Sequence, residues 1–259
     1  MENSDEDEIS DETGHSELKS IINKIKKIVC FFKKSEAAST YLNDLQKESG
    51  KQPKRLIQEI KTRWNSLYEM VERYLELHEF VSRALRKLIS EKTCKPPNDI
   101  SLDEIESLVE IKELLKPLFL VTKELCSEKN VTASKVIPLL KLLKNNIENI
   151  LPIGAAFDLR RKLLLNLNDR FSKVEEHPIL SVATLLDPRY KKIHFHQESN
   201  VEAAIGRIAK YLEKINQTSN DEPPPPPPKR SRDSNCLWQI HDDLVDSQNE
   251  TIIVNEDNI

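Results

Sequence analysis

Apolar residues recur at helical spacing along most of the chain. Between residues 18 and 32 they fall on one stripe at intervals of three and four, with lysines off it, which predicts an amphipathic, one-sidedly basic helix. A second helix is predicted over about 36–48, ending near Gly50, because glycine commonly ends a helix. A longer stripe runs from Leu67 to Leu88 and includes His78, which we expect to be partly buried and hydrogen-bonded.

Capping residues indicate where later helices begin. Ser66 with Glu69, and Ser101 with Glu104, have the spacing of a capping box, in which each residue satisfies a backbone N–H near the other. Thr62 is an alternative cap for the first of these helices. Further helices are predicted over about 101–127, 132–151, 155–175, 178–186 and 199–216.

Prolines disturb this helical pattern at several points. Pro117 should kink or split its helix, Pro138 should disturb the next one, and Pro188 should stop the helix over 178–186. The short stretch 55–61 is the one candidate strand, although a strand needs a partner.

Both ends of the chain are acidic and the middle is basic. Residues 1–13 hold seven acidic and no basic side chains, and 217–259 hold nine acidic and three basic ones. Residues 14–216 therefore carry 36 basic against 27 acidic side chains, a net charge of +9. We expect disorder in 1–13 and in the Pro-rich 217–259. The basic middle fits either polyanion binding or a solvated lysine-rich surface.

Other features of the composition argue against several classes of protein and of binding site. Only 4 glycines argue against a nucleotide-binding parallel sheet, which needs them at phosphate loops. The 4 cysteines show no paired spacing for zinc or redox chemistry, so no metal and no cofactor is expected, and a reduced intracellular setting is favoured. No apolar run is long enough to span a membrane.

Two motifs stand out beyond periodicity. The first is Thr62-Arg63-Trp64-Asn65-Ser66, and the second is Leu186-Asp187-Pro188-Arg189-Tyr190-Lys191, with Val131–Pro138 between them. In this order and spacing they resemble hAT-family transposases, and in particular the BED zinc-finger proteins derived from them. The resemblance covers roughly residues 16–216.

The resemblance implies a mainly α fold with at most one short strand. By analogy, residues 14–63 correspond to the end of a ribonuclease-H-like core, with two helices and the strand. Residues 64–216 correspond to the family's all-helical insertion domain. The resemblance also implies a nuclear protein.

The family's chemistry is metal-dependent strand transfer by three acidic residues, and none of these can be matched to a position in this chain. The BED finger and the C-terminal dimerisation segment are not matched either. We therefore expect no enzyme activity and assign no catalytic residue.

One family role can be transferred by motif. The family's tryptophan at the position of Trp64 stacks on an unpaired base near the DNA ends, and Arg63 lies beside it. Stacking on an extruded base is physically sound, and the alternative is that Trp64 is a core anchor at a helix start.

A second basic cluster follows Pro188. Arg189, Lys191 and Lys192 are candidate phosphate contacts, or else belong to a solvated loop. His194-x-His196 lacks a third metal ligand. The prolines at 223–228 with Lys229-Arg230 fit a spacer, a ligand for an aromatic groove or an import signal.

These observations leave four functional hypotheses. The first is a non-catalytic DNA-binding protein derived from a transposase. The second is a helical module that binds a protein partner or self-associates through exposed apolar stripes. An active nuclease and a truncated product without function complete the set.

Overall fold

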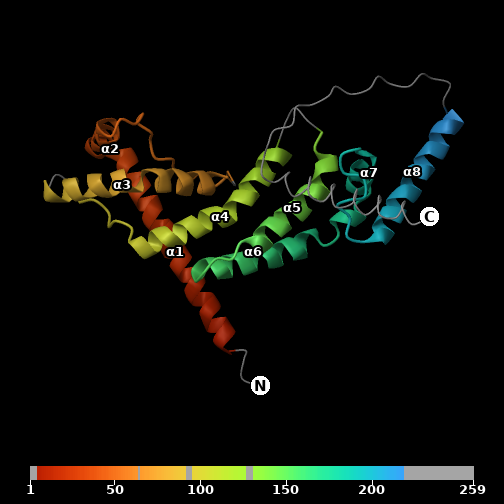
Figure 1. The fold of residues 1–259 in the computed structure, drawn as a ribbon, viewed down its shortest axis with the longest axis horizontal. Coiled ribbons are helices and arrows are strands. Elements are labelled where there is room, and N and C mark those ends of the chain that lie inside the picture. The colour runs from red at the N-terminus through yellow and green to blue at the C-terminus, as the bar shows by residue number, and fades with distance from the viewer. Residues whose placement is uncertain (1–4, 64, 92–94, 127–130, 219–259) are drawn as a thin grey trace, which may run out of the picture. The chain divides into compact units, whose positions relative to one another are not determined.

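The computed structural model describes residues 5–63, 65–91, 95–126 and 131–218 (Figure 1). Two compact units divide the chain. The first comprises residues 1–119 with 150–163, and the second comprises 120–149 with 164–259. All regular elements of the described residues are helices, so the mainly α fold class is confirmed. None of these helices is long and apolar enough to cross a membrane.

The first unit is built on α1 (Asp5–Lys34), α2 (Glu36–Glu48), α3 (Ser66–Ser90) and the start of α4 (Leu102–Leu125). Its core contains the predicted stripes. Ile25 and Ile28 of α1 are fully buried, as are Tyr74 and Leu88 of α3, and Leu108 of α4 joins the same cluster. The alternation of three and four in the sequence thus identified the buried faces. His78 is half-buried, with its Nδ1 atom 2.7 Å from the carbonyl oxygen of Leu75, as predicted.

The acidic N-terminal segment differs from the prediction. Residues 5–13, expected to be a disordered tail, form the first turns of α1. Acidic side chains near a helix N-terminus interact favourably with the helix dipole, and glutamate is a good helix former. The predicted tail over 217–259 lies outside the described residues from 219 onwards.

The two predicted capping boxes had different outcomes. Ser101 and Glu104 form one: the Ser101 N–H donates to the Glu104 carboxylate at 2.9 Å, and the Glu104 N–H donates to the Ser101 hydroxyl at 3.3 Å. Ser66 does not, because it is already the first residue of α3 and Asn65 is the N-cap. The Ser66 hydroxyl instead bonds to the chain that precedes the helix.

The strand predicted over 55–61 is wrong. Residues 51–60 have no regular structure and 61–62 form a turn, and no strand occurs among the described residues. The sequence there suits an extended conformation, but no neighbouring strand pairs with it. Its backbone bonds to side chains instead.

The prolines disturb the helices less than expected. Pro117 lies inside an uninterrupted α4, so it does not split that helix, and Leu114 and Val121, about one turn on either side, are buried. Pro138 falls in the first turn of α5 (Val136–Asn149), where backbone N–H groups have no helical partner to lose. Thr132 precedes a short 3₁₀ turn over Ala133–Lys135 and makes no side-chain cap.

The second unit centres on α7 (Pro178–Leu186), which contacts α5, the 133–135 turn and α8 (Glu198–Thr218). The observed bounds of α7 match the prediction. Along the chain, α5 is followed by α6 (Ala155–Phe171), whose residues are divided between the two units, and then by a 3₁₀ turn over Val174–Glu176. Thr184 of α7 is fully buried and donates to the Ser134 carbonyl at 3.1 Å.

Candidate nucleic-acid interface

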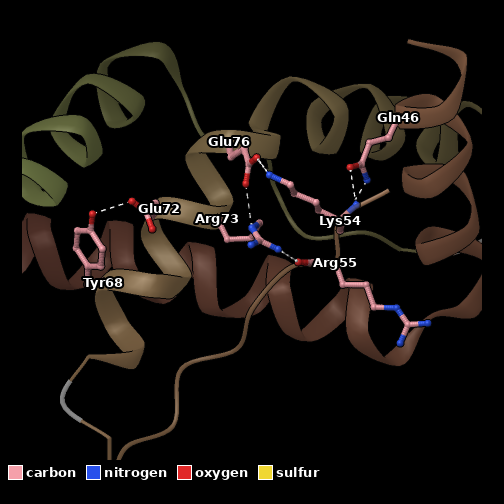
Figure 2. A network of polar contacts seen from close by, with 7 residues as sticks. All are labelled: Gln46, Lys54, Arg55, Tyr68, Glu72, Arg73 and Glu76. Atoms are coloured by element: carbon pink, nitrogen blue, oxygen red, sulfur yellow. Dashed lines mark hydrogen bonds and ion pairs between the residues drawn. The ribbon is translucent and has the colours of Figure 1, made fainter. Parts of the chain in front are cut away.

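An extended segment, residues 51–63, joins α2 to α3 and carries Arg63. Its backbone is fixed first by Gln46, which is 1% exposed at the end of α2. The Gln46 side-chain oxygen accepts from the Lys54 N–H at 2.9 Å, and its nitrogen donates to the Lys54 carbonyl at 3.1 Å (Figure 2). One buried amide thereby satisfies both backbone groups of Lys54, as a partner strand would.

A second anchor comes from α3. Arg73 donates from Nη1 to the Arg55 carbonyl at 3.1 Å, and its Nε lies 3.0 Å from the Glu76 carboxylate (Figure 2). Lys54 also pairs with Glu76. The hydrogen bond from Lys54, with the charges of Lys54 and Arg73, lowers the pKa of Glu76 against the opposing effect of burial. The carboxylate therefore stays ionised and keeps both cations in place.

The end of the segment is held by Ser66. Its hydroxyl accepts from the Ile60 N–H at 2.9 Å and lies 2.8 Å from the carbonyl oxygens of Ile60 and Arg63, to one of which it donates at a time. The Arg63 N–H closes the turn on the Ile60 carbonyl at 2.8 Å. Two residues later in α3, Tyr68 stacks on Phe119 with ring centroids 4.5 Å apart. The backbone that carries Arg63 is thus tied to a packed helix.

The segment presents a run of cations to solvent. Its five basic side chains are all exposed, namely Lys51, Lys54, Arg55, Lys61 and Arg63. Its one acidic residue, Glu59, pairs with Lys26 of α1.

Four of the five cations, Lys51, Arg55, Lys61 and Arg63, have no ion-pair partner in the part of the chain that the structure describes, although the Lys51 ammonium lies 5.1 Å from the centroid of the Phe80 ring. They are therefore available to an external anion. We call residues 51–63 the basic segment.

Arg63 is the predicted site residue that this arrangement favours. Trp64, its neighbour, lies outside the described residues, so its stacking role stays a prediction. Arg55 and Lys61 were missed by the sequence analysis. The charge excess of 14–216 was a signal, but it could not distinguish them from cations already paired within the fold.

The cluster after Pro188 belongs to the second unit, so the predicted residues do not share one unit. Arg189 donates from Nε and Nη2 to the two Asp187 carboxylate oxygens at 2.9 and 2.7 Å, and its guanidinium lies 4.9 Å from the Tyr190 ring. Burial raises the pKa of Asp187, but hydrogen bonds from Arg189 and Ser134 outweigh it and lower that pKa to about 2. The guanidinium of Arg189 is therefore already bonded to a carboxylate within its own turn.

Lys191 and Lys192 are exposed beside it, Lys191 with a left-handed φ of 46°. Both stay candidate phosphate contacts.

The two histidines that follow have separate environments. His194 is fully buried, with its ring 6.0 Å from that of Tyr190, edge to face. His196 bonds to Glu175 through its ring Nδ1 at 3.1 Å and its N–H at 2.8 Å. Asn200 donates to the same carboxylate at 3.1 Å, so that Glu175 ties the 3₁₀ turn to the start of α8.

The described residues contain no group of three or more His, Cys, Asp or Glu side chains arranged to hold a metal ion. The expectation of no metal and no cofactor stays a prediction.

Comparison with known proteins gives two matches. The family described as the ZBED1 RNase-like helical domain matches residues 9–113. The human protein named zinc finger BED domain-containing protein 4 is 29% identical over 205 residues, which cover 79% of this chain. The chain spans only 17% of the length of that relative. No solved structure matches the chain. Both matches agree with the motifs: over these residues the chain is similar to transposase-derived proteins of the hAT/BED type.

Proposed function

We propose that this chain is a non-catalytic, nuclear DNA-binding protein of transposase origin, and that the basic segment is its DNA-binding surface. One observation carries the proposal: the exposed Arg55, Lys61 and Arg63 lie on a backbone that Gln46, Arg73 and Ser66 hold in place. Phosphate contacts by such cations release counterions and supply most non-specific DNA affinity. Because the backbone is already ordered, binding costs less conformational entropy.

Two further parts of the chain carry DNA contacts in the proposal. Trp64 follows the basic segment directly and would stack on an unpaired base, as its motif implies by resemblance. Lys191 and Lys192 would add phosphate contacts from the second unit, and Arg189 would orient their loop through Asp187. In this assignment Arg189 is a positioning residue.

The test is fluorescence anisotropy of the full chain with duplex and hairpin-ended DNA over a salt series. Affinity should fall steeply as salt rises, with a slope of about 0.9 for each phosphate contact. A variant with Arg55, Lys61 and Arg63 changed to alanine should bind more weakly and with a shallower slope.

The matched control removes the same charge from exposed lysines elsewhere, at Lys19, Lys47 and Lys116. If both triple variants lose affinity equally, the basic segment is not the binding surface. Trp64→Ala should remove about 1–3 kcal/mol of any preference for hairpin ends. DNA cleavage that needs divalent metal and disappears on substitution of one carboxylate would overturn the non-catalytic assignment.

A second candidate function is protein interaction through α8. The first half of this helix contacts α7 and buries two of its residues, Val201 at 8% and Ala204 at 0% exposed. Further along, Ile205, Leu212 and Ile215 are all more than half exposed, at 53%, 55% and 54%. A stripe at this spacing is typical of helices that pair with a partner.

We propose a second copy of this chain as the partner of α8. Sedimentation velocity should show a dimer that Leu212→Lys dissociates, whereas Lys210→Leu should leave it intact. A monomer at all concentrations would contradict this candidate and leave the DNA-binding proposal untouched.

A further inference from the structure

A surface hollow of 620 Å³ lies on the first unit, between α1 and the loop that leads into α4. On α1, Lys27, Phe31 and Lys34 follow one another at intervals of four and three, so they share one face of the helix. From the loop, Lys95 and Pro96 also line the hollow. Two segments more than sixty residues apart in the sequence therefore form one site, which the sequence pattern could not reveal.

The rim of the hollow is positively charged. Lys27, Lys34 and Lys95 are exposed and have no ion-pair partner among the residues that the structure describes. Lys26 also lines the hollow but pairs with Glu59 of the basic segment. No aspartate or glutamate lines it. Three uncompensated lysines around a small concave surface attract an anion with several charged groups.

The floor of the hollow is apolar. Its apolar lining residues, Cys30 and Phe31 of α1 and Pro96 and Pro97 of the loop, are all half-buried. The Phe31 ring is itself held edge to face against Phe32, with centroids 5.6 Å apart. A half-buried aromatic ring and two prolines offer flat surfaces for another ring to stack on. Free phosphate would use the rim but would leave this floor uncovered.

We propose that this hollow binds single-stranded nucleic acid, with one base on the Phe31 floor and its flanking phosphates on the lysine rim. The inference rests on the proposed DNA-binding function and adds a second site to it. A duplex keeps its bases stacked inside, so only an unpaired base exposes the face that the floor would cover. Aromatic surfaces within cationic grooves are the general means of binding single strands without sequence preference.

The position of the hollow supports a continuous path for a single nucleic-acid strand from the hollow to the basic segment. Lys26 lines the hollow and contacts Glu59, and Lys33, on the same helix, donates to Gln58 at 2.9 Å. The basic segment therefore runs beside the hollow in the same unit. A strand leaving the lysine rim meets the cations of the basic segment next, so an unpaired DNA end and its adjoining duplex can contact both sites.

The chain contains its own reporter for a test. Cys30 lies in the hollow, whereas Cys126 is exposed at the end of α4 and serves as an internal reference. The full chain is alkylated with iodoacetamide, with and without an oligothymidine of about 12 nucleotides. Peptide mass spectrometry then gives the rate at each cysteine. We expect the oligonucleotide to slow Cys30 severalfold and leave Cys126 unchanged.

Three variants locate the effect. Alanine at Lys27, Lys34 and Lys95 should abolish the protection of Cys30, arginine at the same positions should preserve it, and alanine at Lys19, Lys47 and Lys116 should not affect it. If the alanine variant fails to fold, the wild-type protection and its retention in the arginine variant still decide the proposal.

The outcomes separate this site from the proposed function. If DNA binds while the Cys30 rate is unchanged, the hollow is not a binding site and the basic segment alone carries the function. If polyglutamate protects Cys30 as well as the oligonucleotide does, the hollow takes acidic peptides and the nucleic-acid assignment is overturned. If neither single-stranded nor duplex DNA binds at low salt, both proposals fail.

Discussion

The side chain of Gln46 pairs with the backbone of Lys54 in both directions, accepting from its N–H at 2.9 Å and donating to its carbonyl at 3.1 Å. The same amide nitrogen also donates to the Leu42 carbonyl at 3.1 Å. A residue that is 1% exposed therefore has its side-chain amide fully engaged. With Arg73 and Ser66, Gln46 is one of three side chains that fix the backbone of the basic segment.

Replacing Gln46 by methionine should destabilise the fold by about 1–3 kcal/mol, because both backbone groups of Lys54 lose their partner while the buried volume is kept. Urea denaturation followed by circular dichroism measures this. Gln52→Met, at an exposed position of the same segment, is the control and should change stability by less than about 0.5 kcal/mol. Equal stabilities for the two variants would show that Gln46 does not hold the segment.

In the second unit, Glu175→Ala should cost about 1–3 kcal/mol, since it removes the common acceptor of His196 and Asn200 from a site that is 8% exposed. The neighbouring Glu176 is exposed, so Glu176→Ala is a matched loss of charge with little expected effect. Thermal unfolding of both variants makes the comparison. A larger loss in Glu176→Ala would contradict the assigned network.

The Asp187–Arg189 pair predicts a defined pH dependence. The folded-state pKa of Asp187, about 2, lies below its ordinary value of 3.8, so the folded state binds fewer protons than the unfolded state. The contribution of the ionised Asp187 to the free energy of unfolding is therefore complete above pH 3.8 and is lost as the pH falls towards 2. It amounts to roughly 2 kcal/mol. In Asp187→Asn, unfolding free energy should fall less between pH 5 and pH 2 than in wild type, and parallel pH profiles would refute the prediction.

Arg189 and its neighbouring lysines should have opposite effects. Arg189→Ala removes two hydrogen bonds to Asp187 and should lower stability, with only a modest effect on DNA affinity. The double variant Lys191→Ala and Lys192→Ala should leave stability nearly unchanged and weaken DNA binding at low salt. Differential scanning fluorimetry and anisotropy on the same samples provide both quantities. Strong loss of affinity in a stably folded Arg189→Ala variant would return Arg189 to the DNA contacts.

Local signals in the sequence were enough to predict most helices. The predicted bounds of α2 and α7 match those observed, since Gly50, with its left-handed φ of 71°, and Pro188 end or follow them. The capping-box spacing shows the limit of such signals. It predicted Ser101 correctly and failed at Ser66, because the hydroxyl of Ser66 finds partners in the preceding turn.

What the sequence could not supply was pairing between distant residues. The stretch 55–61 has the composition of a strand, but whether a strand forms depends on a partner, and here Arg73 and Ser66 of α3 bond to the backbone of Arg55 and Ile60 instead. The motif predicts Arg189 as a phosphate contact, whereas the structure shows its guanidinium bonded to Asp187. The free cations Arg55 and Lys61 could be recognised only after the paired ones had been identified.

Lysine reactivity in the presence of DNA tests the central claim most directly. The full chain is acetylated with and without duplex DNA at low salt, and each lysine is quantified by peptide mass spectrometry. Bound DNA should protect Lys51 and Lys61 of the basic segment, while Lys19, Lys47 and Lys116 react at their original rates. If DNA is bound and Lys51 and Lys61 react as fast as before, the basic segment is not the DNA-binding surface.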